Sequence, residues 1–160
     1  MSIINVKEND KYLAEYCRLC SLEWGEPKTK KEMNNFVRKK KEEVLKGDKV
    51  ISVLGLVDDN ILMGFISLFK YDSDKRKDLT PWYATMYVKS EYRGKGFSKL
   101  LNDAILDEAK KLGYDRVYLK TDLVDYYEKY GAKYIEDLES GEKLYYIDCT
   151  TKKSAKMPSY

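Results

Sequence analysis

The sequence predicts an α/β domain built on a mixed central β-sheet of about seven strands flanked by four helices. Its 160 residues suit one domain with a single core. The apolar pattern changes period along the chain, in the order strand, two helices, three strands, helix, strand, helix and two strands. Residues 82–120 give strand, helix and strand, and such a unit joins parallel strands through a right-handed crossover. The remaining strands suit antiparallel pairs, so a mixed sheet is expected.

Two helices are expected after a short first strand at residues 3–6. Residues 11–24 place their apolar side chains on one stripe at helical spacing. Thr29 is placed to cap a second helix, with Glu32 three residues later as in a capping box. This second helix is expected to end at Gly47.

The second half of the chain continues the alternation. A third helix is expected between Gly96 and Gly113, because the apolar residues between these glycines recur at helical spacing. A fourth, short helix is expected over residues 122–130. Turn residues separate the other β-forming runs. These expected strands cover residues 50–57, 61–71, 82–88, 116–120, 132–135 and 143–148.

Composition excludes several classes of function. The chain has no histidine, so Ser-His-Asp and Cys-His nucleophiles and His-ligated metals are excluded. Its three cysteines, Cys17, Cys20 and Cys149, suit a reducing compartment, and the helical stripe around the first two favours core packing over redox or metal chemistry. No apolar run approaches the roughly 20 residues that span a bilayer, and no secretory signal is recognisable. We expect a cytoplasmic protein with no membrane contact and no metal.

Two glycines and three cations mark the junction that leads into the third helix. Gly94 and Gly96 let the main chain approach a bulky anion, since neither has a Cβ atom. A helix start carries free N–H groups, and Arg93, Lys95 and Lys99 add positive charge. The loop is therefore predicted to hold a phosphate or pyrophosphate. The alternative is a glycine-containing turn with solvated lysines, and the spacing fits neither the P-loop nor the dinucleotide-binding pattern.

Two separated motifs resemble those of the GNAT N-acetyltransferase family. The family signature R/Q-x-x-G-x-G/A is similar to Arg93-Gly94-Lys95-Gly96-Phe97-Ser98, with Ser98 where glycine or alanine is usual. The family's late FYEKxGF motif is similar to Tyr126-Tyr127-Glu128-Lys129-Tyr130-Gly131, which Ala132 follows. The resemblance covers nearly all of residues 1–148 and does not indicate a substrate.

The resemblance implies a GNAT-like fold that uses acetyl-CoA as its acetyl donor, without a metal. Main-chain groups of Met86, Tyr87 and Val88 would pair with the pantetheine arm, and an N–H there would polarise the thioester carbonyl. The residues that would hold the pyrophosphate are Arg93, Gly94, Lys95, Gly96, Phe97 and Ser98.

Tyr127 is the residue that the resemblance implies as the general acid for the departing sulfur. A phenol with a pKa of about 10 stays protonated at neutral pH and can donate to a thiolate whose pKa is about 8.5. Packing is the other role open to this side chain, and Tyr130 is expected in the core. Asp122 and Asp125 occupy the region where many family members place an asparagine.

The general base and the acceptor pocket each have several candidates. The carboxylates considered as the base are Glu23, Glu26 and Asp78, and a water chain to solvent is the alternative. The aromatic residues considered for the acceptor pocket are Trp24, Trp82 and Tyr83, which also suit core positions.

The sequence thus predicts an acetyltransferase domain over residues 1–148 and a polar tail over residues 149–160. We expect direct attack of a primary amine, on a small molecule or a peptide, on acetyl-CoA in a ternary complex. One alternative is a non-catalytic acetyl-CoA-binding module or sensor. Another is a nucleic-acid-binding protein using the basic helix at residues 29–46, although a solvated helix face is favoured there. Family habit also implies a homodimer through the late strands.

Overall fold

The computed structural model of the protein describes residues 1–149, so all of the predicted tail except Cys149 lies outside the described residues. The strands are β1 (Ser2–Asn5), β2 (Val50–Asp58), β3 (Ile61–Phe69), β4 (Trp82–Val88), β5 (Arg116–Thr121), β6 (Lys133–Asp137) and β7 (Lys143–Asp148). They form one mixed sheet in the order β1-β2-β3-β4-β5-β7-β6, which confirms the predicted α/β class and strand number. The α-helices are α1 (Asp10–Cys20), α2 (Lys30–Lys46) and α3 (Phe97–Lys111).

The predicted fourth helix over residues 122–130 is wrong, because residues 1–149 contain three α-helices and not four. Only Tyr127–Tyr130 are helical in this stretch, in a single 3-10 turn called η4. Two local features prevent a longer helix. The Leu123 N–H donates to Thr121 Oγ1 at 3.0 Å. Asp125 has a φ of 57°, which a right-handed helix cannot include.

The ends of the second predicted helix are confirmed. Thr29 Oγ1 accepts a hydrogen bond from the Glu32 N–H at 3.0 Å, as a capping threonine should. Gly47 follows the last turn with a φ of 79°, the left-handed conformation that ends many helices. The first helix, α1, continues into a π-helical turn at Ser21–Gly25, so the helical stretch reaches the predicted end.

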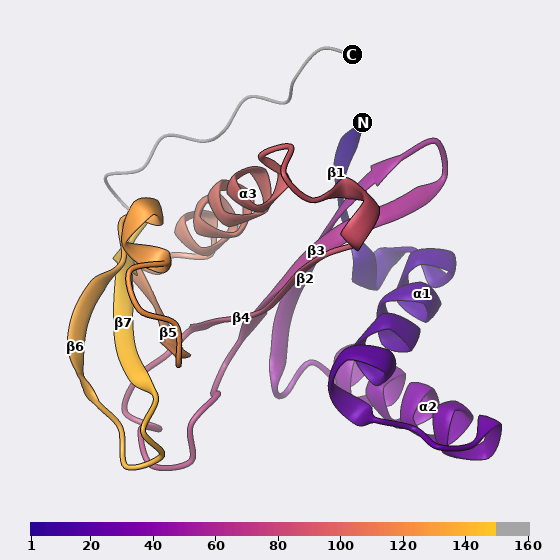
Figure 1. The fold of residues 1–160 in the computed structure, drawn as a ribbon, viewed down its shortest axis with the longest axis horizontal. Coiled ribbons are helices and arrows are strands. Elements are labelled where there is room, and N and C mark those ends of the chain that lie inside the picture. Colours follow the sequence, from indigo (N-terminus) through magenta and orange to yellow (C-terminus); the bar gives the residue numbers. More distant parts are fainter. Residues whose placement is uncertain (150–160) are drawn as a thin grey trace.

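Two hydrophobic cores hold the helices against opposite faces of the sheet. Figure 1 shows α1 and α2 on one side of the strands and α3 on the other. The core under α3 includes Met63, Leu101, Ile105, Val117 and Ile147. The core under α1 and α2 includes Tyr16, Phe65 and Trp82, together with Cys17 and Cys20, which are buried as predicted. No helix within residues 1–149 is long and apolar enough to cross a membrane.

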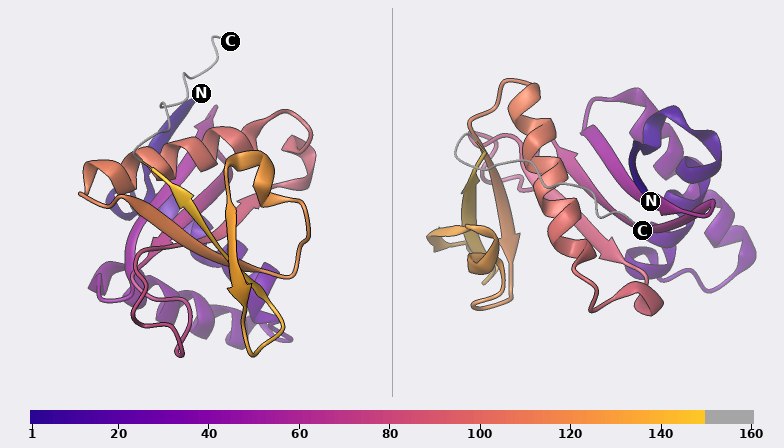
Figure 2. Two further views of the ribbon diagram at one scale, coloured as in Figure 1. Left: turned by 90° about the vertical axis from the view of Figure 1, so that its left-hand side faces the viewer. Right: turned by 90° about the horizontal axis from the view of Figure 1, so that it is seen from above.

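The sheet divides between β4 and β5. These strands are parallel, as predicted, but within the described residues they pair at one position, where Trp82 lies beside Tyr118. The Tyr118 N–H donates to the Pro81 carbonyl at 2.9 Å, and the strands separate beyond this point. Figure 2 shows the β5–β7–β6 group set apart from the other strands, with α3 between them when seen from above. Over the described residues, the later part of β4 therefore has an edge without a strand partner.

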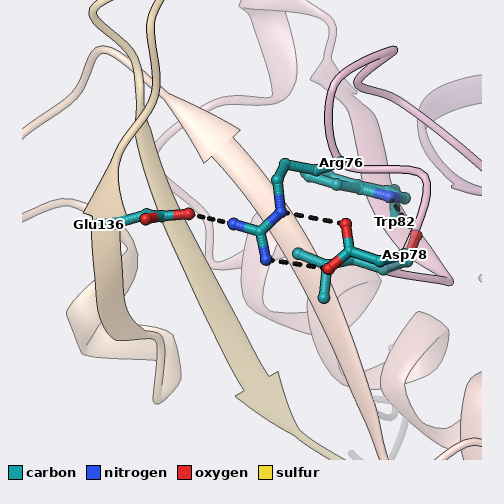
Figure 3. A network of polar contacts seen from close by, with 5 residues as sticks. Arg76, Asp78, Trp82 and Glu136 are labelled. Atoms are coloured by element: carbon teal, nitrogen blue, oxygen red, sulfur yellow. Dashed lines mark hydrogen bonds and ion pairs between the residues drawn. The ribbon is translucent and has the colours of Figure 1, made fainter.

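An ionic network joins the two parts of the sheet at their closed end. The Arg76 guanidinium donates two hydrogen bonds of 3.1 Å to Asp78 and another to Glu136 on β6 (Figure 3). Lys75 and Glu139 form a second ion pair between the same segments. Exposed ion pairs contribute little to stability because water screens them, so the network orients the segments more than it stabilises the fold.

Candidate functional site

A cleft of about 560 Å³ opens where β4 and β5 separate. It is lined by the end of β4, the following loop, the start of α3, η4 and the π-helical turn after α1. Every cofactor-binding residue predicted from the sequence lines this cleft except Lys95. Its lining also includes Glu23, Tyr92, Lys99, Tyr126, Lys129 and Tyr130.

The two loop glycines leave room for a large anion. Gly94 has a φ of 78° and Gly96 a φ of 81°, which place both in the left-handed region that favours glycine. A Cβ atom added at either position would meet no described atom within 4 Å. Since both residues line the cleft, this open space fits a phosphate group, and a side chain there would fill it.

The start of α3 offers main-chain donors to the same space. Gly96 is the N-cap residue, and among residues 1–149 no side chain caps this helix end. The first N–H that bonds within the helix is that of Leu100, to the Gly96 carbonyl at 3.3 Å. The preceding amides, at residues 97–99, therefore have no acceptor within the helix, and such groups attract anions.

The three cations of the loop have different surroundings. The Arg93 Nε atom donates to the Val88 carbonyl at 2.7 Å, which ties the loop to the end of β4. The Lys99 ammonium lies 2.7 Å from the carboxylate of Asp103, which is 6 % exposed. The Lys95 ammonium lies 6.0 Å from the Tyr92 ring centroid, and the residue is outside the cleft.

The main chain of β4 presents alternate residues to the cleft. The Lys89 N–H donates to the Met63 carbonyl at 2.9 Å, so Tyr87, two residues earlier and paired with Phe65, is also hydrogen-bonded to β3. The main-chain groups of Met86 and Val88 therefore face the open edge. The Val88 carbonyl there is taken by Arg93, which leaves the two N–H groups and the Met86 carbonyl directed at the cleft.

A β-bulge determines this alternation. On β3, Phe65 pairs with Tyr87 but Ser67 pairs with Ala84, so β4 has one more residue than β3 between these pairs. Thr85 lies in the bulge with a φ of 50°, an unfavourable value for a β-branched residue that costs about 1–3 kcal/mol. Without the bulge, the opposite set of residues would face the cleft.

Three tyrosines form a cluster beside the cleft. Two of them belong to η4, and the third is the residue just before it. Tyr126 and Tyr130 line the cleft, whereas Tyr127 packs edge-on against Tyr83, with ring centroids 6.0 Å apart. Burial, and then the nearby Tyr126 hydroxyl, raises the pKa of Tyr127 above its usual value. Burial is also the main cause that raises the pKa of Tyr130 to about 12.

The structure separates the aromatic residues considered for an acceptor pocket. Trp82 is fully buried and donates through Nε1 to the Leu79 carbonyl, so it belongs to the core. Tyr83 is 4 % exposed, and within the described chain its hydroxyl has no hydrogen-bond partner. Trp24 is 49 % exposed, and its ring lies 6.5 Å from that of Tyr87. Of these three residues, only Trp24 can meet a ligand from solvent.

The structure also separates the three candidate bases. Glu23 lines the cleft, whereas Glu26 lines a separate hollow beside Phe36. Asp78 lies before β4, at the closed end of the divided sheet, and is bound to Arg76. Its hydrogen bonds from Arg76 hold the pKa of this carboxyl below its usual value, which makes it a weak base.

Several residues of the cleft were not predicted from the sequence. Tyr126, Lys129 and Tyr130 are three and four residues apart, a spacing that places them on one helical face. That spacing could have identified them, because it lies within the late motif. Glu23 was considered from the sequence as a candidate base, and the π-helical turn after α1 brings it to the cleft.

Comparisons with known proteins agree with this arrangement. Residues 13–132 match the family described as "Acetyltransferase (GNAT) family". N-alpha-acetyltransferase 30 of Schizosaccharomyces pombe is 27 % identical over 131 residues, which are 79 % of this chain and 81 % of that protein.

Solved structures with the same fold include two acetyltransferases. Aminoglycoside 6'-acetyltransferase type Ii has a TM-score of 0.71 and 20 % identity, over 96 % of this chain and 100 % of that one. PaiA N-acetyltransferase from Thermoplasma acidophilum, in complex with coenzyme A, has a TM-score of 0.59 and 22 % identity, over 92 % and 99 %. The family match covers most of the chain, and the divided sheet and the glycine-flanked helix start agree with it. This chain belongs to the GNAT acetyltransferase family.

Proposed function

We propose that the protein transfers the acetyl group of acetyl-CoA to a primary amine by direct attack in a ternary complex. The observation that carries this proposal is the meeting of two features in one cleft. The unpartnered edge of β4 ends beside the glycine-flanked start of α3. An extended pantetheine arm suits the first feature and a pyrophosphate suits the second.

The residues of the cleft fit acetyl-CoA as a donor. We propose that the main-chain groups of residues 86–88 pair with the pantetheine arm. Residues 93–98 and the cations Lys99 and Lys129 would hold the pyrophosphate. Arg93 would act mainly by fixing the loop, since its Nε atom already bonds to Val88.

The proposed chemistry needs a neutral amine, a stabilised carbonyl oxygen and a protonated leaving group. The amine lone pair attacks the thioester carbon, the C–S bond breaks, and the amine loses one proton. A β4 N–H, at Met86 or Val88, would stabilise the developing oxyanion. Tyr127 would give its phenolic proton to the departing thiolate, and its raised pKa keeps that proton available at neutral pH.

Among the three carboxylates considered, we propose Glu23 as the group that takes the proton from the amine. It lines the donor cleft, and the neighbouring Trp24 exposes an aromatic surface. Glu26 and Asp78 lie elsewhere, in a separate hollow and in the Arg76 network. An amine that enters beside α1 would therefore meet Glu23 before either of the others.

The class of amine is the least constrained part of the proposal. The relatives described above act on aminoglycosides and on N-terminal α-amino groups, according to their names. Both kinds of acceptor are primary amines, which suits a small-molecule or peptide substrate here. We further propose that residues 1–148 form the acetyltransferase domain and that it works in the cytoplasm. A homodimer through the late strands stays a prediction.

The proposal is tested by two measurements on the same protein sample. Calorimetry with CoA and acetyl-CoA measures donor binding, and thiol release over a panel of aminoglycosides, polyamines, amino acids and peptides measures transfer. We expect binding, and thiol release that requires an amine. Binding of acetyl-CoA without release on any member of the panel would favour the sensor alternative. Absence of binding would contradict the cleft assignment itself.

A further inference from the structure

A chain of three hydroxyl groups crosses the core from α1 to the bulge in β4. The Tyr16 hydroxyl and Ser67 Oγ share a hydrogen bond of 3.1 Å. Thr85 Oγ1 donates to the same Ser67 oxygen. Tyr16 and Ser67 are fully buried and Thr85 is half-buried, so the bond between Tyr16 and Ser67 is shielded from water.

The surroundings of Ser67 are apolar, so the presence of a hydroxyl group there needs an explanation. On the same face of β3, Phe65 and Phe69 lie two residues before and after it and are buried in the core that contains Trp82. A buried hydroxyl is unfavourable unless it is hydrogen-bonded, and alanine would fill much of this space without that cost. The two bonds to Tyr16 and Thr85 therefore account for a serine at this position.

Thr85 occupies a conformation that its residue type resists. Its φ of 50° is left-handed, where glycine is the usual residue and a β-branched side chain is an outlier. Such a conformation persists only when surrounding contacts enforce it. The hydrogen bond to Ser67 anchors the Thr85 side chain at the point where the main chain turns.

The bulge in turn decides which amides reach the cleft. Because of its extra residue, Met86 and Val88 direct their N–H groups to the open edge, and Tyr87 is hydrogen-bonded to β3. A bulge that relaxed to regular strand would turn Tyr87 to the cleft in their place. The conformation of Thr85 therefore controls the donors that face the cleft.

We propose that Ser67, supported by Tyr16, is a positioning residue that holds Thr85 in the left-handed conformation and thereby aims the Met86 and Val88 amides into the cleft. The inference rests on the proposed function, because those amides matter for transfer only if a thioester lies against them. It assigns a role to the core behind β4, on the side away from α3. Ser67 itself touches no substrate in this account.

The test uses Ser67→Ala, with Ser52→Ala as a matched control that removes a buried serine hydroxyl from the neighbouring strand β2. The first readout is amide hydrogen exchange of the unliganded protein at Tyr87 and Lys89, which lie just beyond the bulge. We expect about tenfold faster exchange at these amides in Ser67→Ala alone, as for the loss of one hydrogen bond. The second readout is turnover, where kcat should fall about tenfold while KM for acetyl-CoA changes less than about twofold.

A glycine at the bulge provides the decisive comparison. Thr85→Gly accepts the left-handed conformation without help, so Ser67→Ala should change exchange and kcat by less than about twofold in that background. If Ser67→Ala fails to fold, Thr85→Val should reproduce the loss, and Thr85→Ser, which keeps the hydroxyl, should not.

Two results would overturn the inference. One is unchanged exchange at Tyr87 and Lys89 in Ser67→Ala. The other is an equal loss of kcat with threonine and with glycine at position 85. A wild-type protein that binds acetyl-CoA but transfers to no amine would contradict the proposed function instead. The exchange readout would then still decide whether Ser67 holds the bulge.

Discussion

Arg93 Nε donates a 2.7 Å hydrogen bond to the carbonyl of Val88, the last residue of β4. The arginine therefore joins the strand edge to the glycine loop, the two parts of the cleft that would bind different parts of coenzyme A. Its guanidinium also lies 5.8 Å from the Tyr87 ring centroid. This contact makes Arg93 a structural element of the loop as well as a positive charge.

The first prediction compares Arg93→Gln with Lys95→Gln. The Arg93 variant loses a charge-assisted hydrogen bond worth about 1.5–3 kcal/mol, so CoA binding should weaken about tenfold or more. The Lys95 variant loses an exposed charge outside the cleft and should weaken binding less than about threefold. Calorimetric titration with CoA at one salt concentration measures both. Equal losses would show that only the charge of Arg93 matters.

The second prediction concerns Gly96→Val, with Gly113→Val at the other end of α3 as its control. Both glycines have positive φ and open space beside the Cα atom, so either variant bears a similar strain of about 1–2 kcal/mol. Of Gly96 and Gly113, only Gly96 lines the cleft. We expect CoA binding to be lost in Gly96→Val and kept in Gly113→Val. Normal affinity in a folded Gly96→Val protein would refute the assignment of the loop.

The third prediction separates the clustered tyrosines through Tyr126→Phe, Tyr127→Phe and Tyr130→Phe. If Tyr127 is the general acid, its variant alone should lower kcat, by about ten- to a thousandfold, with little change in CoA affinity. Since burial raises its pKa from the ordinary value of 10.0, wild-type kcat should show no loss of this acid below about pH 10.

Turnover at saturating substrates, with chemistry rate-limiting, is the measurement for this set. A larger loss in Tyr126→Phe or Tyr130→Phe would transfer the role to a residue that lines the cleft. Unaltered turnover in all three variants would remove the cluster from the mechanism.

The fourth prediction compares Glu23→Gln with Glu26→Gln, three residues apart on the same segment. If Glu23 accepts the amine proton, its variant should lower kcat/KM about a hundredfold near neutral pH. The deficit should shrink as the pH rises toward the pKa of the amine, because more of the substrate is already neutral. The Glu26 variant should stay within about twofold. A pH-independent deficit in Glu23→Gln would indicate a binding role instead of a proton-accepting one.

The fifth prediction uses two buried tyrosines with opposite hydrogen-bonding states. The Tyr83 hydroxyl has no partner within the described residues, so Tyr83→Phe should raise the free energy of unfolding by about 1 kcal/mol. The Tyr16 hydroxyl is bonded to Ser67, so Tyr16→Phe should lower it by about 1 kcal/mol. Urea unfolding measures both values. A destabilised Tyr83→Phe protein would mean that its hydroxyl has a partner in solution.

Features that depend on neighbouring residues were predictable from the sequence. The cap at Thr29, the helix end at Gly47 and the junction at Gly94 and Gly96 follow from local conformational preferences. The strand over residues 82–88 followed from composition, and its bounds are those of β4. These local features were enough to locate most of the residues that line the cleft.

Features that depend on distant residues were not predictable in the same way. Thr85 gives no local sign of a positive φ, because its anchor is Ser67 on another strand. The three loop cations look alike in the sequence, but their partners are Val88, Asp103 and the Tyr92 ring. The prediction of a fourth helix was wrong because Asp125 adopts a left-handed conformation, which helical spacing does not reveal.

The two cores on opposite faces of the sheet have a consequence for how such a protein can diverge. The core under α3 backs the glycine loop, whereas α1, α2 and the exposed Trp24 form the other side. Mutations of exposed residues on the second surface need not disturb the first, as long as they keep the Tyr16–Ser67–Thr85 hydrogen bonds that connect α1 to β4. Under the proposed function, selection could therefore exchange the molecule that receives the acyl group while the machinery that handles the donor is inherited unchanged.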